Sequence, residues 1–324
     1  MRRKRLVIRR VTTSGRELPS DAGATVEAFL RDCEEFMEMD FDLDTLLNGD
    51  ETSIYIDPPT RRTYDHIGAR KVEAVATGQQ KTRVSVCLTA TAGDTKLKPL
   101  ILIPRKNPIK NWTPPANVEI VYGTNGNFNE SVISEYYVPK ILVSYKHQSR
   151  YHDLHLVFDQ APCHTTQRSK AAFSGASIKV KWVGKRLTYL TQPADQSWMS
   201  PFKGRYFKKW NNWLIHAPKS YTAAGNVKSP GYAKVVEWIS EAWSELDAGM
   251  ITNSFQRCGI TSRNIADYSH QLRHFMRTTE LVDDVVQQED FHDDDGAFGG
   301  DGDDWDSQTE ALFDSESDID ENEE

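Results

Sequence analysis

The stretch His155-Leu156-Val157-Phe158-Asp159-Gln160 is a short apolar run that ends in an acid, and a Pro-Cys-His turn follows it. A run of this length and composition is typical of a buried β-strand. A second run, residues 46–57, carries Asp50 inside an otherwise strand-like pattern. A carboxylate at a buried strand is costly unless something charged compensates it. The two acids are therefore the first candidates for a functional site.

Working outward from these runs, the periodicity of apolar residues predicts strands and helices in a mixed order. The predicted helices are residues 21–39, 131–145, 167–173, 199–213 and 232–246, and the predicted extended segments are 46–57, a hairpin over 83–104, 118–122, 155–158, 178–183 and 187–190. A hairpin followed by strands that alternate with helices indicates an α/β fold, a mixed sheet with an antiparallel start and parallel additions. If strands 46–57 and 155–158 are neighbours, Asp50 and Asp159 meet at one sheet edge, where open α/β sheets bind ligands.

A third acid, Asp195, follows Gln192-Pro193-Ala194 and opens a predicted helix rich in aromatic and basic residues. Pro and Asp are both favoured near a helix start, so Asp195 on its own is explained as a helix cap. Three carboxylates that converge on metal ions would instead suit phosphoryl transfer on nucleic acid. The basic residues of this helix, which form either a solvated surface or contacts to DNA phosphates, are Lys203, Arg205, Lys208 and Lys209.

Charge is segregated along the chain. The formal net charge is −8, yet residues 280–324 hold 20 of the 47 acidic residues and none of the 39 Lys and Arg. The remaining 279 residues therefore carry 39 basic against 27 acidic side chains, a balance that suits a polyanionic partner such as DNA. The acidic segment has too little apolar content to fold, so we expect a disordered tail that contacts basic proteins or the basic body.

The chain ends and the cysteines restrict the class of protein. Residues 1–10 carry six basic side chains, a pattern of nuclear-localisation signals, of phosphate-contacting arms and of plain solvated tails. No apolar run approaches the roughly 20 residues that a membrane helix needs, so no membrane partner is expected. The four cysteines lie far apart without zinc-finger spacing, which favours reduced thiols. Nucleic-acid binding in the nucleus is the expectation.

Three blocks around the acids resemble a known family. The blocks Asn48-Gly-Asp50-Glu-Thr52, Leu156-Val-Phe-Asp159-Gln-Ala-Pro-Cys-His164 and Leu190-Thr-Gln-Pro-Ala-Asp195 are similar to those of DDE-type transposases. The most similar branch is pogo, of the mariner/pogo superfamily, whose third acid is Asp. The resemblance covers roughly residues 5–280. It implies a ribonuclease H-like fold, a mixed sheet flanked by helices.

The resemblance also implies a chemistry. Asp50, Asp159 and Asp195 would be the catalytic residues and would bind two Mg²⁺ or Mn²⁺ ions, with Asp50 bridging them. The implied reaction is cleavage of DNA phosphodiester bonds and strand transfer. His164 would contact DNA or support the site. Gly49 departs from the family, which has a bulky apolar residue there, and this could loosen the strand. Gln160 stands where the family has Asn.

We therefore predict three parts: a basic arm and linker remnant over residues 1–24, the DDE endonuclease domain over 25–279 and the disordered acidic tail over 280–324. The family's two helix-turn-helix domains, which precede the linker, are expected to be missing. The alternative function is a catalytically silent, recruited transposase fragment that binds DNA or chromatin as a regulatory protein. Whether the protein forms a homodimer stays open.

Overall fold

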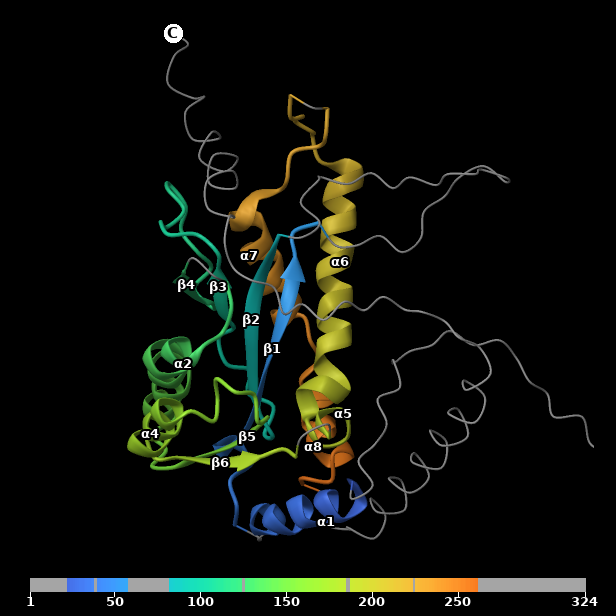
Figure 1. Ribbon diagram of the computed structural model, residues 1–324. Helices are drawn as coiled ribbons and strands as arrows, with labels where there is room; N and C mark the ends of the chain where they lie inside the picture. Colours follow the sequence, from blue (N-terminus) through green and yellow to red (C-terminus); the bar gives the residue numbers. More distant parts are fainter. Residues whose placement is uncertain are drawn as a thin grey trace, which may run out of the picture.

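The computed structural model describes residues 22–37, 40–57, 82–123, 126–184, 187–223 and 225–261. These residues build a six-stranded sheet with the order β4-β3-β2-β1-β5-β6 (Figure 1). The strands are β1 (Leu46–Tyr55), β2 (Arg83–Thr91), β3 (Leu100–Ile103), β4 (Glu119–Tyr122), β5 (Leu154–Phe158) and β6 (Ile178–Trp182). Most of the basic arm and all of the acidic tail lie outside the described residues, so the predicted domain boundaries stay a prediction.

The sheet is mixed, as predicted. β2 runs antiparallel to both of its neighbours, β1 and β3. The pairs β1–β5, β5–β6 and β3–β4 are parallel. The hairpin over residues 83–104 is confirmed, and so is the adjacency of the two strands that carry Asp50 and Asp159. β1 is central, with the antiparallel half of the sheet on one side and the parallel half on the other.

Helices cover both faces of the sheet. They are α1 (Ala22–Asp32), η1 (Glu34–Met37), η2 (Leu43–Thr45), α2 (Glu130–Val132), η3 (Ile133–Val143), α3 (Ser144–Ser149), α4 (Gln167–Gly175), α5 (Thr188–Thr191), η4 (Ala194–Trp198), α6 (Met199–His216), α7 (Gly231–Ser244) and α8 (Ala248–Arg257). α2, η3 and α3 form one continuous helix whose middle has wider π turns and contains Pro139, a residue that cannot supply a normal helical hydrogen bond. Figure 1 shows α2 and α4 on one side of β1 and the long α6 on the other.

Alternation along the strands divides the core between the two faces. On β1, Leu46 packs into the cluster with α6, α7 and α8, whereas Leu47 packs into the cluster with η3 and α4. On β5, Val157 and Phe158 divide in the same way. Side chains two residues apart on a strand share a face. Asp50 therefore lies on the α6 face of β1, and Glu51 lies on the η3 face.

The turn between β2 and β3 holds the C-terminal end of α7. The Lys96 ammonium group donates hydrogen bonds to the carbonyl oxygens of Trp243 (3.1 Å), Ser244 (2.7 Å) and Leu246 (2.7 Å). The Trp243 indole in turn donates to Leu97 O at 2.8 Å. A cation at a helix C-terminus satisfies carbonyl groups that lack helical partners. These bonds fix the C-terminal end of α7 against the sheet, and Trp238 of α7 packs in turn against Tyr206 and Trp213 of α6.

The structure corrects one predicted element and contains one helix that was not predicted. Residues 187–190 were expected to be extended, but α5 is helical there, because the Leu190 and Thr191 amides both donate to Leu187 O at 2.9 and 3.0 Å. A short apolar run cannot distinguish a strand from a buried helical turn. The helix α8 was not predicted, although Asp247 caps it by accepting a bond from the Met250 amide at 2.8 Å.

Candidate active site

The parallel register of β1 and β5 places the first two acids side by side. Asn48 pairs with Val157 at the end of the ladder. Asp50 lies two residues further along β1, on the α6 face, and Asp159 lies two residues beyond Val157, past the end of β5. Asp159 is the first residue after β5, which is the strand end where parallel sheets bind ligands. The sheet topology therefore brings the positions of Asp50 and Asp159 to the same edge of the sheet.

Two buried amides dock the third acid on β1. The Asn48 side chain donates to Val157 O at 2.8 Å and accepts from the Ala194 amide at 2.9 Å. The Gln192 side chain donates to Gly49 O at 3.3 Å. Neither amide side chain has exposed surface. The bond to Ala194 holds the first turn of η4 against the sheet, and Asp195, the next residue, is thereby held beside Asp50.

The electrostatics of Asp50 record this proximity. Burial of the carboxyl group raises the pKa of Asp50 well above its usual range, and the negative charges of Asp195, Glu51 and Asp159 raise it further. Asp195 acts both through its charge and through a hydrogen bond between the two carboxyl groups. Asp50 also accepts a bond from the Glu51 amide at 2.9 Å. Without a cation, the first and third acids are therefore best held together by a shared proton.

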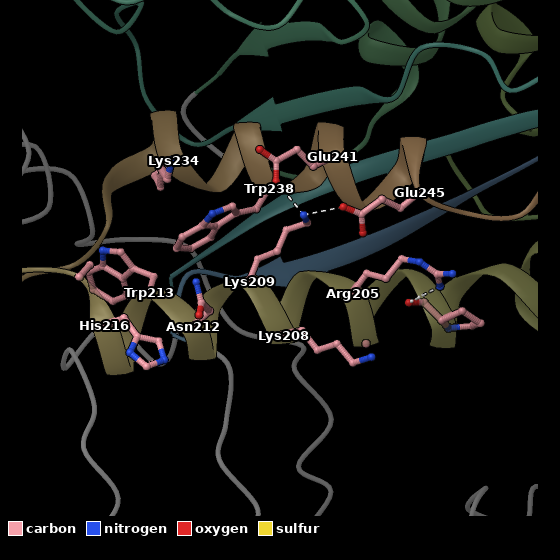
Figure 2. A pocket seen from close by; sticks show the side chains of 13 residues that line it. Arg205, Lys208, Lys209, Asn212, Trp213, His216, Lys234, Trp238, Glu241 and Glu245 are labelled. Atoms are coloured by element: carbon pink, nitrogen blue, oxygen red, sulfur yellow. Dashed lines mark hydrogen bonds and ion pairs between the residues drawn. The ribbon is translucent and has the colours of Figure 1, made fainter.

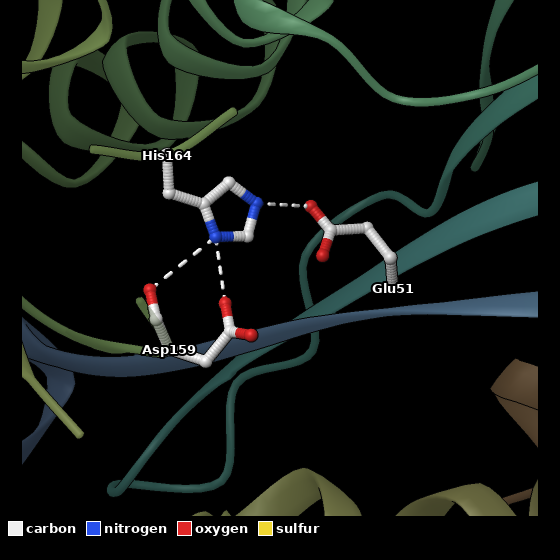
Figure 3. Close-up of side chains that lie close together, drawn as sticks. All are labelled: Glu51, Asp159 and His164. Carbon is white, nitrogen blue, oxygen red and sulfur yellow. Dashed lines mark hydrogen bonds and ion pairs between the residues drawn. The ribbon is translucent and has the colours of Figure 1, made fainter. Parts of the chain in front are cut away.

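A histidine joins the second acid to a fourth carboxylate. His164 has no exposed surface, and its Nδ1 and Nε2 lie 2.6 Å from Asp159 Oδ1 and 2.8 Å from Glu51 Oε1 (Figure 3). The ring stacks on Phe158 with centroids 3.9 Å apart. Burial alone would lower the pKa of His164, but hydrogen bonds to Asp159, Cys163 and Glu51 together raise it to about 12. The imidazole is therefore a cation that donates to both carboxylates at neutral pH.

The space beside Gly49 is already filled. A Cβ atom on Gly49 would lie 2.5 Å from Tyr137 Oη and 3.2 Å from Thr89 Oγ1, and these two oxygens are hydrogen-bonded to each other at 3.0 Å. Tyr137 therefore occupies the volume that a bulky apolar side chain would take at this position. The structure therefore has no gap at Gly49. Tyr137, on the facing helix η3, fills the space and compensates for the loosening of β1 that a glycine could cause.

The basic residues predicted to contact DNA differ in their availability. Lys203 and Lys208 are exposed on α6. Lys209 points toward α7 and forms ion pairs of 2.7 Å with both Glu241 and Glu245, so its charge is neutralised (Figure 2). The half-buried Arg205 donates to Pro201 O at 3.4 Å. His164 has no exposed surface and lies inside the site, an arrangement that suits support of the site, the other role expected for it, better than contact with DNA.

A groove of about 970 Å³ lies between α6 and α7. Its lining includes Arg205, Lys208 and Lys209 on α6, with Trp213 and Trp238 at 6.1 Å between ring centroids. The groove is open and partly basic, but the glutamates of α7 line its opposite wall. The free positive charge therefore belongs to the α6 side.

In the described part of the chain, no helix is long and apolar enough to cross a bilayer.

These features define a class: an α/β domain in which acids from two adjacent parallel strands and from a following helix gather at one sheet edge. The family described as DDE superfamily endonuclease matches residues 81–255, which is more than half of the chain. The protein therefore belongs to the DDE superfamily endonucleases. Asp159 and Asp195 lie inside the matched residues, and Asp50 lies before them.

Relatives and solved structures agree with this assignment. The chain is 25% identical over 232 residues to the mouse protein "Pogo transposable element with KRAB domain" (70% of this chain, 37% of the relative). It is 23% identical over 267 residues to the human protein of the same name (81% and 43%). The chain thus spans about two fifths of the length of the curated relatives it matches. Pogo transposable elements are the relatives that the block resemblance predicted.

A solved structure shares the fold of this chain. The solved structure described as "Mos1 transposase paired-end complex with left transposon end" is similar with a TM-score of 0.51 at 12% identity, covering 77% of this chain and 64% of that chain. At this identity the likeness concerns the fold. The ribonuclease H-like mixed sheet flanked by helices is confirmed.

Sequence reasoning missed the contacts that assemble the site. Asn48, Gln192 and Glu51 were read only as members of their blocks. Asn48 carried a usable signal, since it shares a strand face with Asp50 and is a polar residue at a position where the pattern calls for burial. The hydrogen bond between Asn48 and Ala194 joins residues 146 apart in sequence. Nothing local to either residue indicates it.

Proposed function

We propose that this chain is a divalent-metal-dependent DNA endonuclease domain that cleaves phosphodiester bonds and carries out strand transfer. One observation carries the proposal: the buried Asp50 carboxyl is hydrogen-bonded to Asp195 and also feels the charges of Glu51 and Asp159, and burial and these charges raise its pKa. Carboxylates gathered in this way are costly for folding alone and typical of functional sites. Membership of the DDE superfamily endonucleases supports the same reading.

The donor atoms fit hard divalent cations. Carboxylate oxygens are the ligands that Mg²⁺ and Mn²⁺ prefer, and Asp50, Asp159 and Asp195 would hold such ions. Bound there, the ions would activate a water or a DNA 3′-hydroxyl and stabilise the leaving oxygen. Glu51, Asp159 and His164 also lie close enough together for a cation site. However, both ring nitrogens of His164 already hold carboxylates, so we assign the ion to the three aspartates.

The chain's own residues supply position and charge. Asn48 and Gln192 hold the turn that carries Asp195 against β1. Lys203 and Lys208, exposed at the start and middle of α6, would contact backbone phosphates and give affinity that does not depend on base sequence. The Mos1 structure was solved with a transposon end, which supports DNA as the partner here. Nuclear localisation follows as a prediction from a DNA substrate.

A nicking assay tests the proposal. Purified protein with Mn²⁺ should convert supercoiled plasmid to open circles, and Asp159→Ala should reduce the rate by at least about 10²-fold, since a metal ligand is lost. Asp153→Ala is the matched control, because Asp153 is a partly exposed acid just before the other end of β5, where it pairs with His152. Nicking that survives in Asp159→Ala would refute the proposed active site.

The same preparation distinguishes the alternative function. DNA binding without nicking, unchanged by metal and by Asp50→Asn, would identify a catalytically silent DNA-binding protein. Deleting residues 280–324, which hold 20 acidic residues, should strengthen DNA binding if the acidic segment competes with DNA for the basic face of α6. Unchanged affinity would exclude that masking role.

A further inference from the structure

The bridge between Glu51 and Asp159 is built from a rigid frame. His164 is held in the turn after β5 by a bond from its own amide to Ala161 O at 3.0 Å. The next residues begin α4, where Thr166 caps the helix by accepting from the Ser169 amide at 3.1 Å. The ring is further fixed by stacking on Phe158, the last residue of β5. The imidazole therefore has one orientation, set by backbone and packing.

Asp159, in contrast, lies just beyond the ladder of β5, where no strand pairing restrains it. A carboxylate there would sample several rotamers, and ordering it on metal binding would carry an entropic cost. The bond between Asp159 Oδ1 and His164 Nδ1, at 2.6 Å, removes that freedom. It leaves Oδ2 without a role in the bridge. One oxygen of the second acid is thus held in place while the other is directed elsewhere.

Glu51 completes the arrangement from β1. It belongs to the face opposite Asp50, and its Oε1 accepts from His164 Nε2 at 2.8 Å. Without Glu51 one side of a fully buried imidazole would lack an acceptor, which destabilises that ring orientation. The same contact ties β1 to the turn after β5, across the two strands that carry the first and second acids. Glu51 therefore acts on Asp159 through His164.

We propose that Glu51 and His164 are positioning residues, which hold the Asp159 carboxylate in the orientation that binds a divalent cation. This inference rests on the proposed metal-dependent function. Partners that orient a metal ligand typically change metal affinity or activity by about 10- to 100-fold when they are removed. Because His164 is fully buried and Glu51 accepts from it, the pair should affect the chemical step and the cation rather than DNA affinity.

The test uses the full chain with Mn²⁺ as the probe. Glu51→Ala should weaken Mn²⁺ affinity, measured by isothermal titration calorimetry, by about 10-fold or more. It should also lower kcat for plasmid nicking without changing KM for DNA. Glu51→Gln keeps an oxygen that accepts from His164, so its affinity should stay within about threefold of the wild type. His164→Gln should resemble Glu51→Ala, and His152→Gln, a change at an exposed histidine paired with Asp153, is the control.

The outcomes are distinct. If the wild type binds Mn²⁺ and folded Glu51→Ala binds it equally well, the positioning inference fails while the proposed function stands. A loss in Glu51→Gln as large as in Glu51→Ala would make Glu51 a direct ligand and would also overturn the inference. A wild type that binds neither Mn²⁺ nor Mg²⁺ refutes the proposed function and the inference with it. Because Glu51 is partly exposed, its variants keep the test decisive even if His164→Gln does not fold.

Discussion

Asn48 offers the sharpest test of how the site is assembled. Its side chain has no exposed surface and makes two hydrogen bonds, to Val157 O at 2.8 Å and from the Ala194 amide at 2.9 Å. Asn48→Ala would leave both backbone groups buried without these partners. Each such group costs about 1–3 kcal/mol, so we expect a loss of about 3 kcal/mol. That is on the order of a 10²-fold change in the unfolding equilibrium.

Gln192 is the matched comparison. It is equally buried and docks the same turn, but its one hydrogen bond, to Gly49 O, is long at 3.3 Å. Its Oε1 is buried and has no hydrogen-bond partner among the described residues, so the native side chain already carries a desolvation penalty. Gln192→Met removes that penalty together with the weak bond. We expect the free energy of unfolding to change by less than about 1 kcal/mol.

Urea unfolding measures both variants. With a slope of about 3 kcal/mol per molar urea, Asn48→Ala should lower the midpoint by about 1 M, and Gln192→Met should leave it nearly unchanged. Loss of the bond to Ala194 should also release Asp195, so Mn²⁺ affinity of folded Asn48→Ala should fall at least about 10-fold. If Asn48→Ala destabilises no more than Gln192→Met, the reasoning about the buried bonds is wrong. If stability falls but Mn²⁺ affinity does not, Asn48 does not position Asp195.

Three further changes probe packing, capping and charge, and a fourth probes the DNA surface. Gly49→Ala should lower the free energy of unfolding, measured in urea, by about 1–3 kcal/mol, because its Cβ would meet Tyr137 Oη at 2.5 Å. Adding Tyr137→Phe in a double variant should restore part of that loss. Lys96→Met should lower the free energy of unfolding by about 2 kcal/mol, since the carbonyls at the end of α7 lose a charged donor. An unchanged urea midpoint would contradict this. Asp50→Asn should raise the thermal unfolding midpoint of the metal-free protein, because it removes a buried carboxyl group next to other negative charges. It should also abolish the increase in this midpoint that Mn²⁺ produces, and scanning fluorimetry measures both effects. Lys208→Gln should reduce the slope of log Kobs against log salt for DNA by about 0.9 if it contacts one phosphate.

Much of the fold could be predicted because its signals are local. The apolar runs at β1 and β5 and the spacing of aromatic residues on α6 are periodic patterns that survive in the folded chain. Element order indicated the mixed sheet, and Asp50 was expected to meet Asp159 if their strands were neighbours, a condition that the parallel pairing of β1 with β5 meets. The helices α6 and α7 were found to within a few residues at each end, whereas the helix predicted over residues 21–39 already ends at Asp32.

The remaining features depend on contacts that no local pattern records. Asp195 alone looked like a helix cap, and the contacts of Asn48 and Gln192 bring it to Asp50. For His164 the sequence left open contact with DNA or support of the site, whereas the structure buries the ring between the Glu51 and Asp159 carboxylates. The π turns of η4, which carry Asp195 into α6, also leave no signature in the periodicity, although such turns are frequent at functional sites.

The four carboxylates of the site are not equally compensated by positive charge. The pair that lacks a positive partner indicates where a metal cation would stabilise the site most. His164 lies between Glu51 and Asp159 and offsets their repulsion. No such group separates Asp50 from Asp195, whose repulsion raises the pKa of Asp50. In the metal-free fold, the hydrogen bond between the Asp50 and Asp195 carboxyl groups and the bond from the Ala194 amide to Asn48 hold this pair together. A divalent ion gains most where carboxylates are close and unpaired. The first ion should accordingly bind between Asp50 and Asp195, which is why Asp50→Asn is expected both to relieve the repulsion and to remove the response to Mn²⁺.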